Sequence, residues 1–251
     1  LNHTIYGIAN NQFNEKKAKQ NKLANFVSCD LSLLKECELI ILALPIKDLI
    51  NPSQRLVGSI PKRTIVTDVG SVKEAIVNTW ENLHPLFIGS HPMAGTEKKG
   101  VDSGFVDLFD NSKWIITPTQ NSNLKAVRTI SELIKSMDCE ISQASPKEHD
   151  EAVSLISHLP IFLAAALIET ANTENNQSLL DLAQKLAATG FADTSRVGGG
   201  NEQLGLDLAK NNQTNVLNAI YSFKNKLNTL ESLIKEKNWE LLSNKLAEAK
   251  E

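Results

Sequence analysis

The sequence predicts an α/β domain with a largely parallel sheet over residues 1–145, followed by an all-α domain over residues 146–251. In the first part, short β-branched or apolar runs alternate with amphipathic helical stretches, which is the pattern of βα units. Beyond residue 145 the strand signals stop and only helical periodicity remains. A chain of 251 residues is long enough for two domains that each bury a core.

Each strand expected in the first domain is a short apolar or β-branched run. These runs cover residues 4–9, 38–44, 64–69, 86–90, 113–118 and 139–144. Helices fill most of the gaps between them. One helix is expected to begin beside Ser71, because Ser71-Val-Lys-Glu74 has the pattern of a capping box, in which the two side chains bond each other's backbone N–H groups.

The second domain opens at Ser145-Pro146-Lys-Glu148, which combines an N-cap residue, a proline at the first helical position and a second capping box. Within this domain we expect a kink or break at Pro160, a helix end near Gly190 and a loop at residues 198–200.

A later helix of this domain carries one apolar stripe at helical spacing. Core packing explains such a stripe, but a small helical domain has few internal partners for so long a face. We therefore expect a homodimer through the helical domain, with core packing alone as the alternative. The stripe consists of Val216, Ile220, Phe223, Leu227, Leu230 and Ile234.

Composition excludes several classes of protein. A net charge of -3 and a pI of about 6.0 lack the basic excess that a nucleic-acid backbone demands. Cys29, Cys37 and Cys139 are odd in number and widely spaced, which fits neither a disulfide framework nor a metal site and indicates a reducing cytoplasm. Apolar runs at residues 39–44 and 159–168 are shorter than the roughly 20 residues that cross a bilayer. We expect a cytoplasmic protein without a nucleic-acid, metal or membrane partner.

Two segments of the first domain place polar side chains at predicted strand ends, where open α/β sheets bind ligands. In Thr67-Asp-Val-Gly-Ser-Val-Lys73, Ser71 follows a buried strand, although a helix N-cap is its commoner role. In Gly89-Ser-His-Pro-Met-Ala-Gly-Thr96, His91 ends the next strand. A histidine exchanges protons near neutral pH, so His91 is the best acid or base candidate, with a structural role as the alternative.

Two further candidates lie in the helical domain. His158, in Ser157-His-Leu-Pro160, adjoins a proline that frees a backbone carbonyl, and it either caps that irregularity or contacts a ligand. Arg196, in Asp193-Thr-Ser-Arg196, precedes three glycines, where its planar side chain can bind a carboxylate through two hydrogen bonds. A surface salt bridge is the alternative for Arg196.

The strings TDVGSVK, GSHPMAGTE, SHLP and DTSRVGGGN, in this order and at these separations, resemble the prephenate/arogenate dehydrogenase family across essentially the whole chain. The resemblance implies a Rossmann-type dinucleotide-binding domain, an all-α dimerisation domain and an active site in the cleft between them. It also implies the reaction, in which hydride leaves the ring carbon that bears the hydroxyl, the ring carboxylate departs as carbon dioxide and the ring becomes aromatic.

The resemblance assigns roles to the matching residues. His91 would bond the ring hydroxyl and take its proton as hydride leaves, and Ser71 would orient His91 and the nicotinamide. Arg196 would hold a substrate carboxylate. The cleft would also be lined by Thr96, Glu97 and His158.

The sequence departs from the family at its start. The family opens with a strand and a glycine-rich turn that holds the cofactor pyrophosphate, whereas this chain starts at what resembles the second strand, so we expect a truncated or wrongly started chain. After that strand the family carries a carboxylate for the ribose hydroxyls of NAD. Here Ala9, Asn10 and Asn11 stand instead, which favours NADP over NAD, with Lys16 or Lys17 within reach of its phosphate. The remaining cofactor contacts would come from Leu44, Pro45 and Ser71.

Substrate choice depends on the residue after the SHLP string. Relatives that use prephenate often carry a second histidine there, whereas this chain has Ile161, which favours arogenate with prephenate as the alternative. A rival interpretation is a two-domain dehydrogenase of hydroxy acids, but that class would use a helical lysine, and no lysine stands in a comparable motif. The other rival is a non-catalytic module that dimerises or senses an aromatic ligand.

Overall fold

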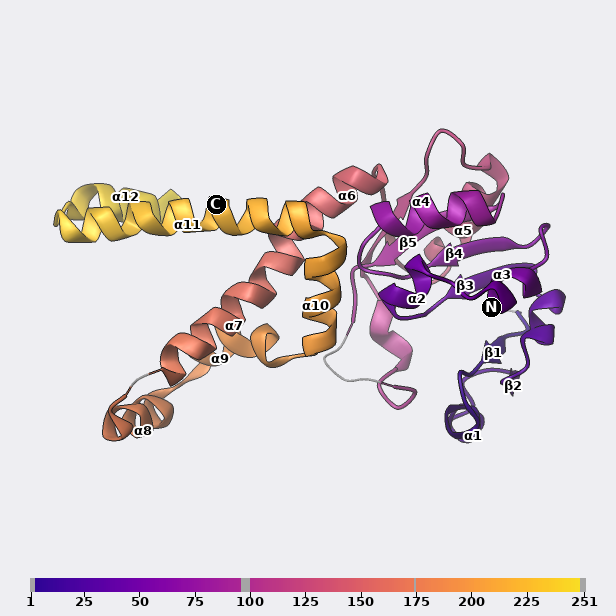
Figure 1. The fold of residues 1–251 in the computed structure, drawn as a ribbon, viewed down its shortest axis with the longest axis horizontal. Helices are drawn as coiled ribbons and strands as arrows, with labels where there is room; N and C mark the ends of the chain where they lie inside the picture. The colour runs from indigo at the N-terminus through magenta and orange to yellow at the C-terminus, as the bar shows by residue number, and fades with distance from the viewer. Residues whose placement is uncertain (1–2, 96–99, 174, 249–251) are drawn as a thin grey trace. The chain divides into compact units, whose positions relative to one another are not determined.

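The structure, a computed structural model, describes residues 3–95, 100–173 and 175–248, which form two compact units (Figure 1). The first unit holds residues 1–152 and 199–211, and the second holds residues 153–198 and 212–251. The first unit therefore extends past residue 145, where the sequence places the domain boundary. It does so because side chains at the start of the helix that follows pack into the first unit.

The first unit is built on a five-stranded sheet with the strand order β3-β4-β5-β6-β7. Strands β3, β4 and β5 run parallel to one another, β6 is antiparallel to β5, and β7 is parallel to β6. The largely parallel sheet is thus confirmed, with one antiparallel pairing in it. The strands are β3 Leu39–Leu42, β4 Ile65–Asp68, β5 Phe87–Pro92, β6 Lys113–Thr117 and β7 Glu140–Gln143.

A separate parallel pair consists of β1 (Tyr6–Ile8) and β2 (Phe26–Ser28), with helix α1 (Gln12–Gln20) between them in the sequence. Within the described residues, no strand of this pair is hydrogen-bonded to the larger sheet. All of the runs predicted as strands form strands, but β2 was missed. Its three residues are too few to show an alternating pattern.

The helices of the first unit pack their apolar faces on the sheet. Helix α5 (Leu124–Lys135) places Ala126, Ile130 and Ile134 one turn apart, and all three are buried against Ile88 and Trp114. The other helices before residue 145 are η1 Leu31–Glu36, α2 Ile46–Ile50, α3 Gln54–Ser59, α4 Glu74–Leu83 and η2 Val106–Phe109.

Helix α6 (Pro146–Val153) begins with the predicted capping box. The Ser145 N–H donates to Glu148 Oε2 over 2.8 Å, and the Glu148 N–H donates to Ser145 Oγ over 3.2 Å. The helix then runs on through a π-helical turn, η3 (Ser154–His158), into α7 (Leu159–Asn172). The break expected at Pro160 is therefore absent. A wider turn just before the proline accommodates its missing N–H without ending the helix.

The rest of the chain is helical, as predicted. The helix end expected near Gly190 lies at Leu186, where α8 ends, and Gly190 itself lies in the first turn of α9. At the glycine run, a Cβ on Gly198 would lie 2.4 Å from the backbone of Ala164, so only glycine allows this close approach to α7. The remaining helices are α8 Gln177–Leu186, α9 Thr189–Ser195, η4 Arg196–Gly199, α10 Glu202–Asn211, α11 Gln213–Lys235 and α12 Trp239–Glu248.

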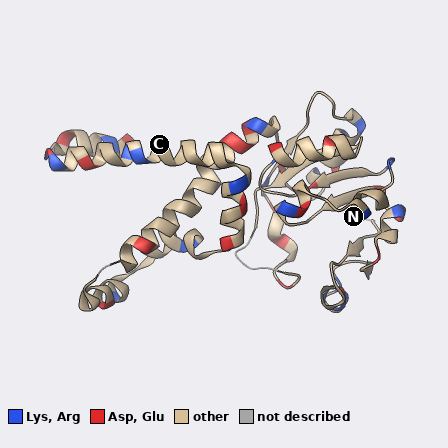
Figure 2. Ribbon diagram, viewed as in Figure 1, with Lys and Arg blue, Asp and Glu red and all other residues tan. Residues whose placement is uncertain are grey.

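The second unit leaves much apolar surface exposed. In the predicted stripe on α11, Val216 is buried, whereas Leu227 is 52% and Ile234 is 53% exposed. Among the described residues, one helical run, Pro146–Asn172, is long and apolar enough to cross a bilayer, although core helices of soluble proteins meet the same criteria. Charged residues of both signs are mixed along α11 and α12 (Figure 2). Exposed apolar area of this extent is typical of a surface that another protein chain covers.

Candidate active site

The C-terminal ends of β3, β4 and β5 lie at one edge of the sheet, because these three strands are parallel. Leu44 and Pro45 follow β3, Ser71 follows β4, and His91 lies near the end of β5. The topology therefore brings together three of the sequence segments that were predicted to form the site.

A buried ion pair lies beneath this edge. The ammonium of Lys73 contacts a carboxylate oxygen of Asp68, and both side chains are fully buried. Lys73 Nζ also donates to the Ser90 carbonyl over 2.8 Å, while Asp68 accepts from the backbone N–H groups of Gly70 (2.8 Å) and Ser90 (3.1 Å). Burial lowers the pKa of Lys73, and the Asp68 carboxylate opposes that shift. The pair thus holds the turn after β4 and the end of β5 in fixed positions.

The Ser90 hydroxyl lies at the centre of a second set of buried contacts. Ser90 Oγ donates to the Asp68 carbonyl over 2.7 Å and lies 3.0 Å from both Thr67 Oγ1 and Trp114 Nε1. Three neighbouring strands are thereby joined one residue before His91. Side-chain bonds of this kind add to the strand ladder and limit how far the His91 backbone can move.

The ring of His91 is held by a chain of side chains. His91 Nδ1 lies 2.9 Å from His149 Nε2, and His149 Nδ1 lies 2.7 Å from Asp150 Oδ1. Asp150 in turn accepts from the backbone N–H groups of Lys73 (2.7 Å) and Glu74 (2.9 Å), which open α4. All three hydrogen-bonded side chains are buried: His91 is 8% exposed, and His149 and Asp150 are each 1% exposed.

The capping box predicted at Ser71 is wrong. Helix α4 begins at Glu74 with Lys73 as its N-cap residue, and no side chain within the helix's own N-terminal segment caps it. The carboxylate of Asp150, from α6, takes the place of the predicted serine. Ser71 is instead a half-buried residue of the turn after β4, and its predicted contact with the cofactor and with His91 stays a prediction.

Sequence reasoning missed His149 and Asp150. They lie on α6, beyond the residues that were assigned to the α/β domain, and they match none of the four family strings. One signal was present in the sequence: His149 is the only one of the five histidines with an acidic residue on each side.

The predicted substrate residues of the helical domain lie in the second unit. His158 ends the π-helical turn, is fully buried, and its Nδ1 lies 3.2 Å from Asn212 Nδ2. Arg196 is exposed in η4, the segment that the Gly198 contact holds against α7. Thr96 and Glu97 lie outside the described residues. The substrate-binding roles of these four residues stay predictions.

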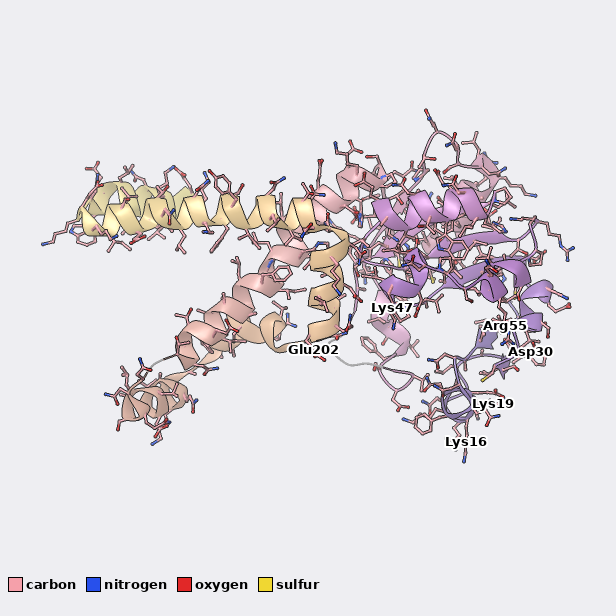
Figure 3. All side chains as sticks on the ribbon, viewed as in Figure 1. Lys16, Lys19, Asp30, Lys47, Arg55 and Glu202 are labelled. Carbon is pink, nitrogen blue, oxygen red and sulfur yellow. The ribbon has the colours of Figure 1, made fainter. Side chains whose placement is uncertain are left out.

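The end of β1 is polar and uncharged. Asn11 caps α1 by accepting from the Asn14 N–H over 2.8 Å, while Asn10 Oδ1 accepts from the side chains of Asn11 (3.0 Å) and Asn14 (2.7 Å). Lys16 projects from α1 and is exposed (Figure 3), whereas Lys17 pairs with Asp102. Residues 9–11 thus carry amide groups and no carboxylate, and the predicted preference for NADP stays a prediction.

Comparisons with known proteins agree with this architecture. Residues 1–143 match the family model of the nucleotide-binding domain of prephenate dehydrogenase, and residues 145–248 match the model of its dimerization domain. The chain is 30% identical to prephenate dehydrogenase of Bacillus subtilis over 216 residues, which are 84% of this chain and 58% of that protein. The chain thus spans little more than half the length of that relative.

Two crystal structures are similar over nearly the whole chain. The structure of Synechocystis arogenate dehydrogenase is 36% identical with a TM-score of 0.86, covering 99% of this chain and 90% of that one. The structure of prephenate dehydrogenase from Aquifex aeolicus in complex with hydroxyphenyl propionate and NAD+ is 29% identical with a TM-score of 0.92, covering 100% and 88%. The predicted fold class, a Rossmann-like nucleotide-binding domain followed by a helical dimerisation domain, is confirmed.

The buried Asp68 and Lys73 pair should be strongly coupled in stability. Asp68→Asn or Lys73→Met alone leaves one charge buried without its partner, and each should lower the free energy of unfolding by about 3–5 kcal/mol. The double variant should lose clearly less than the sum of the two, with a coupling of about 0.5–3 kcal/mol. Urea denaturation of the four proteins measures this cycle. Additive losses would show that the two side chains act independently.

Proposed function

Because the chain belongs to the prephenate/arogenate dehydrogenase family, we propose that it oxidises arogenate to tyrosine with NADP as the hydride acceptor. The observation that carries this proposal is the position of His91. It is a buried histidine at the carboxyl edge of the parallel strands, and its Nδ1 is hydrogen-bonded to His149. The proposed enzyme acts in the cytoplasm on a small, carboxylated ring substrate.

His91 acts as the base in the proposed reaction. It accepts the proton of the substrate's ring hydroxyl while the C–H bond at the same carbon breaks. The nicotinamide, when bound, supplies the acceptor for that hydride. The bond from the ring to its carboxylate then breaks, carbon dioxide leaves, and the electron pair of that bond completes the aromatic ring. The proton returns to the phenolic oxygen, so His91 ends in its starting state.

The other predicted residues would bind and orient the cofactor and the substrate. Leu44, Pro45 and Ser71 would hold the nicotinamide end of the cofactor at the strand ends. Ala9, Asn10 and Asn11, with Lys16, would hold the ribose and its phosphate. Arg196 would pair with a substrate carboxylate, because a guanidinium binds that group through two hydrogen bonds. Roles for Thr96, Glu97 and His158 as further substrate contacts follow from the family strings alone.

Arogenate is favoured over prephenate by the residue at position 161. The two substrates differ in the side chain, which carries an ammonium in arogenate and a keto group in prephenate. Ile161 is half-buried on α7 and offers no hydrogen-bond donor for a keto group. The similarity to the Synechocystis arogenate dehydrogenase points the same way.

We also infer that the protein is a homodimer. The second unit matches the model of a dimerization domain, and it exposes large apolar side chains on several of its helices. In a two-fold dimer the same surface of both protomers would be buried, so each of these residues would lie in the interface once from each protomer. The exposed residues on these helices include Leu179, Leu182 and Leu186 on α8, Leu227 and Ile234 on α11, and Trp239, Leu241 and Leu246 on α12.

An assay of cofactor reduction tests the proposed function. The protein is supplied with arogenate or prephenate, each with NADP or NAD, and the highest kcat/KM is expected for arogenate with NADP. His91→Asn should lower kcat by about 10²–10⁴-fold and change KM little, because it removes the base without removing a binding charge. Activity with none of the four combinations, in a protein that folds, would support the non-catalytic module instead.

Substrate preference should respond to position 161. Ile161→His introduces a donor for the keto side chain, and a hydrogen bond between neutral groups contributes about 0.5–1.5 kcal/mol. The ratio of kcat/KM for prephenate to that for arogenate should therefore rise by about two- to tenfold. Ile161→Leu, which stays apolar, is the matched control. An equal kcat/KM ratio in both variants would mean that the residue at position 161 does not distinguish the side chains of the two substrates.

The dimer should depend on the exposed end of the α11 stripe. Leu227→Glu places a charge in the proposed interface twice per dimer and should shift the protein to monomers at micromolar concentration. Asn228→Glu makes the same change of charge at the neighbouring exposed, polar position and should leave the dimer intact. Sedimentation velocity measures both. A stable dimer in Leu227→Glu would place the interface elsewhere.

A further inference from the structure

We propose that His149 and Asp150 are positioning residues that hold His91 in the tautomer with the proton on Nδ1 and the lone pair on Nε2. The proposal deepens the proposed function and rests on it, because it specifies which nitrogen of His91 acts as the base. Neither residue belongs to the family strings, and both meet His91 only through the contacts of the folded chain.

The donors and acceptors of this chain of contacts can be assigned in order. An ionised carboxylate only accepts, so Asp150 Oδ1 fixes the proton of His149 on Nδ1. The Nε2 of a neutral His149 then carries a lone pair and accepts. His91 Nδ1, 2.9 Å away, must therefore be the donor. A neutral His91 with its proton on Nδ1 has its basic lone pair on Nε2.

Asp150 is held in place by its own hydrogen bonds. Asp150 is 1% exposed and accepts from two backbone N–H groups at the start of α4, where the helix dipole also favours a negative charge. These bonds limit the rotation of the carboxylate. A rigid acceptor that orients one imidazole through another is the same physical arrangement that sets the tautomer of histidines which bind metals or serve as bases.

The contacts from His91 through His149 to Asp150 also matter after His91 has accepted the proton. When His91 takes up a proton at Nε2, its positive charge is adjacent to the acceptor nitrogen of His149, with the Asp150 carboxylate behind that ring. Among the described residues, the other buried charged groups on elements packed against β5 are Asp68 and Lys73, which neutralise each other. Asp150 therefore places a buried carboxylate directly behind the ring that hydrogen-bonds His91.

Two substitutions at the same position separate the contact with His91 from the contact with Asp150. In His149→Gln, the amide oxygen can take the place of Nε2 and still accept from His91, while the contact with Asp150 is lost. In His149→Asn, the shorter amide can still donate to Asp150, but the acceptor for His91 is lost. If His149 only filled space, neither variant would change the tautomer of His91. If His149 acted only by donating to Asp150, the asparagine variant would be the milder of the two.

The positioning role predicts the opposite order. His149→Asn should lower kcat by about 10²-fold, with KM nearly unchanged, and His149→Gln should stay within about tenfold of the parent protein. In His149→Asn the acid limb of the pH profile of kcat/KM should also move to lower pH, since the protonated ring has lost its acceptor. Equal losses in the two variants, or an acid limb that does not move, would overturn the proposal.

A second measurement is independent of turnover. Nitrogen-15 NMR of labelled histidines distinguishes Nδ1–H from Nε2–H tautomers, and the His91 signals are assigned by their absence in His91→Asn. We expect the Nδ1–H form in the parent protein and in His149→Gln, and mainly the Nε2–H form in His149→Asn. An Nε2–H form of His91 in the parent protein would refute the proposed order of donors.

These readouts also distinguish the positioning role from the proposed function. If His91 has the expected tautomer but no substrate is oxidised, the proposed function fails and the positioning contact stands. If arogenate is oxidised and His91→Asn is inactive, but both His149 variants keep full activity and the tautomer, the proposed function stands and the positioning role fails.

Discussion

A carboxylate that has lost its hydration must accept hydrogen bonds from its surroundings, and Asp150 meets this demand with donors from two helices. Two are the backbone N–H groups that open α4, and the third is the ring N–H of His149 beside it on α6. Since the first turn of a helix has no internal acceptors for its own N–H groups, the start of α4 depends on this remote side chain. One buried charge thereby fixes two helices and a histidine ring.

The rest of the site depends on the position of α4. The side chain of its N-cap residue, Lys73, contacts Asp68 and donates to the Ser90 carbonyl. The backbone of the strand that carries His91 is therefore held by Lys73, while the ring of His91 is held by His149. A shift of Asp150 would move both supports together, so the backbone and the side chain of His91 do not vary independently.

The sequence predicted the strands well because their patterns are local. Every run that was assigned as a strand forms one, and the capping box at Ser145 and Glu148 forms as expected. The errors came where local signals compete with packing. The three residues of β2 are too few to show a pattern, and Pro160 is accommodated by a π-helical turn. Gly190 lies in the first turn of α9 rather than at the end of α8, which ends at Leu186.

The candidate site could be predicted only in part from the sequence. The position of His91 at the sheet edge could be predicted because the ends of parallel strands collect at one edge, which follows from topology alone. His149 was missed because it lies 58 residues further along the chain and meets His91 only after folding. Ser71 was assigned a capping role that a distant carboxylate fills, since Ser71 and Glu74 match the capping pattern whether or not a better acceptor arrives from elsewhere.

A physical criterion nevertheless singles out His149 among the histidines of the sequence. A buried histidine base needs an acceptor behind its Nδ1, and that acceptor must itself be anchored if it is to hold one orientation. A second histidine next to an acidic residue meets both conditions, since the carboxylate fixes which nitrogen of that ring accepts. His149, between Glu148 and Asp150, is the histidine of this sequence that does so. The same criterion explains why the acidic partner is Asp150: its side chain, unlike that of Glu148, which caps its own helix, also reaches the start of α4.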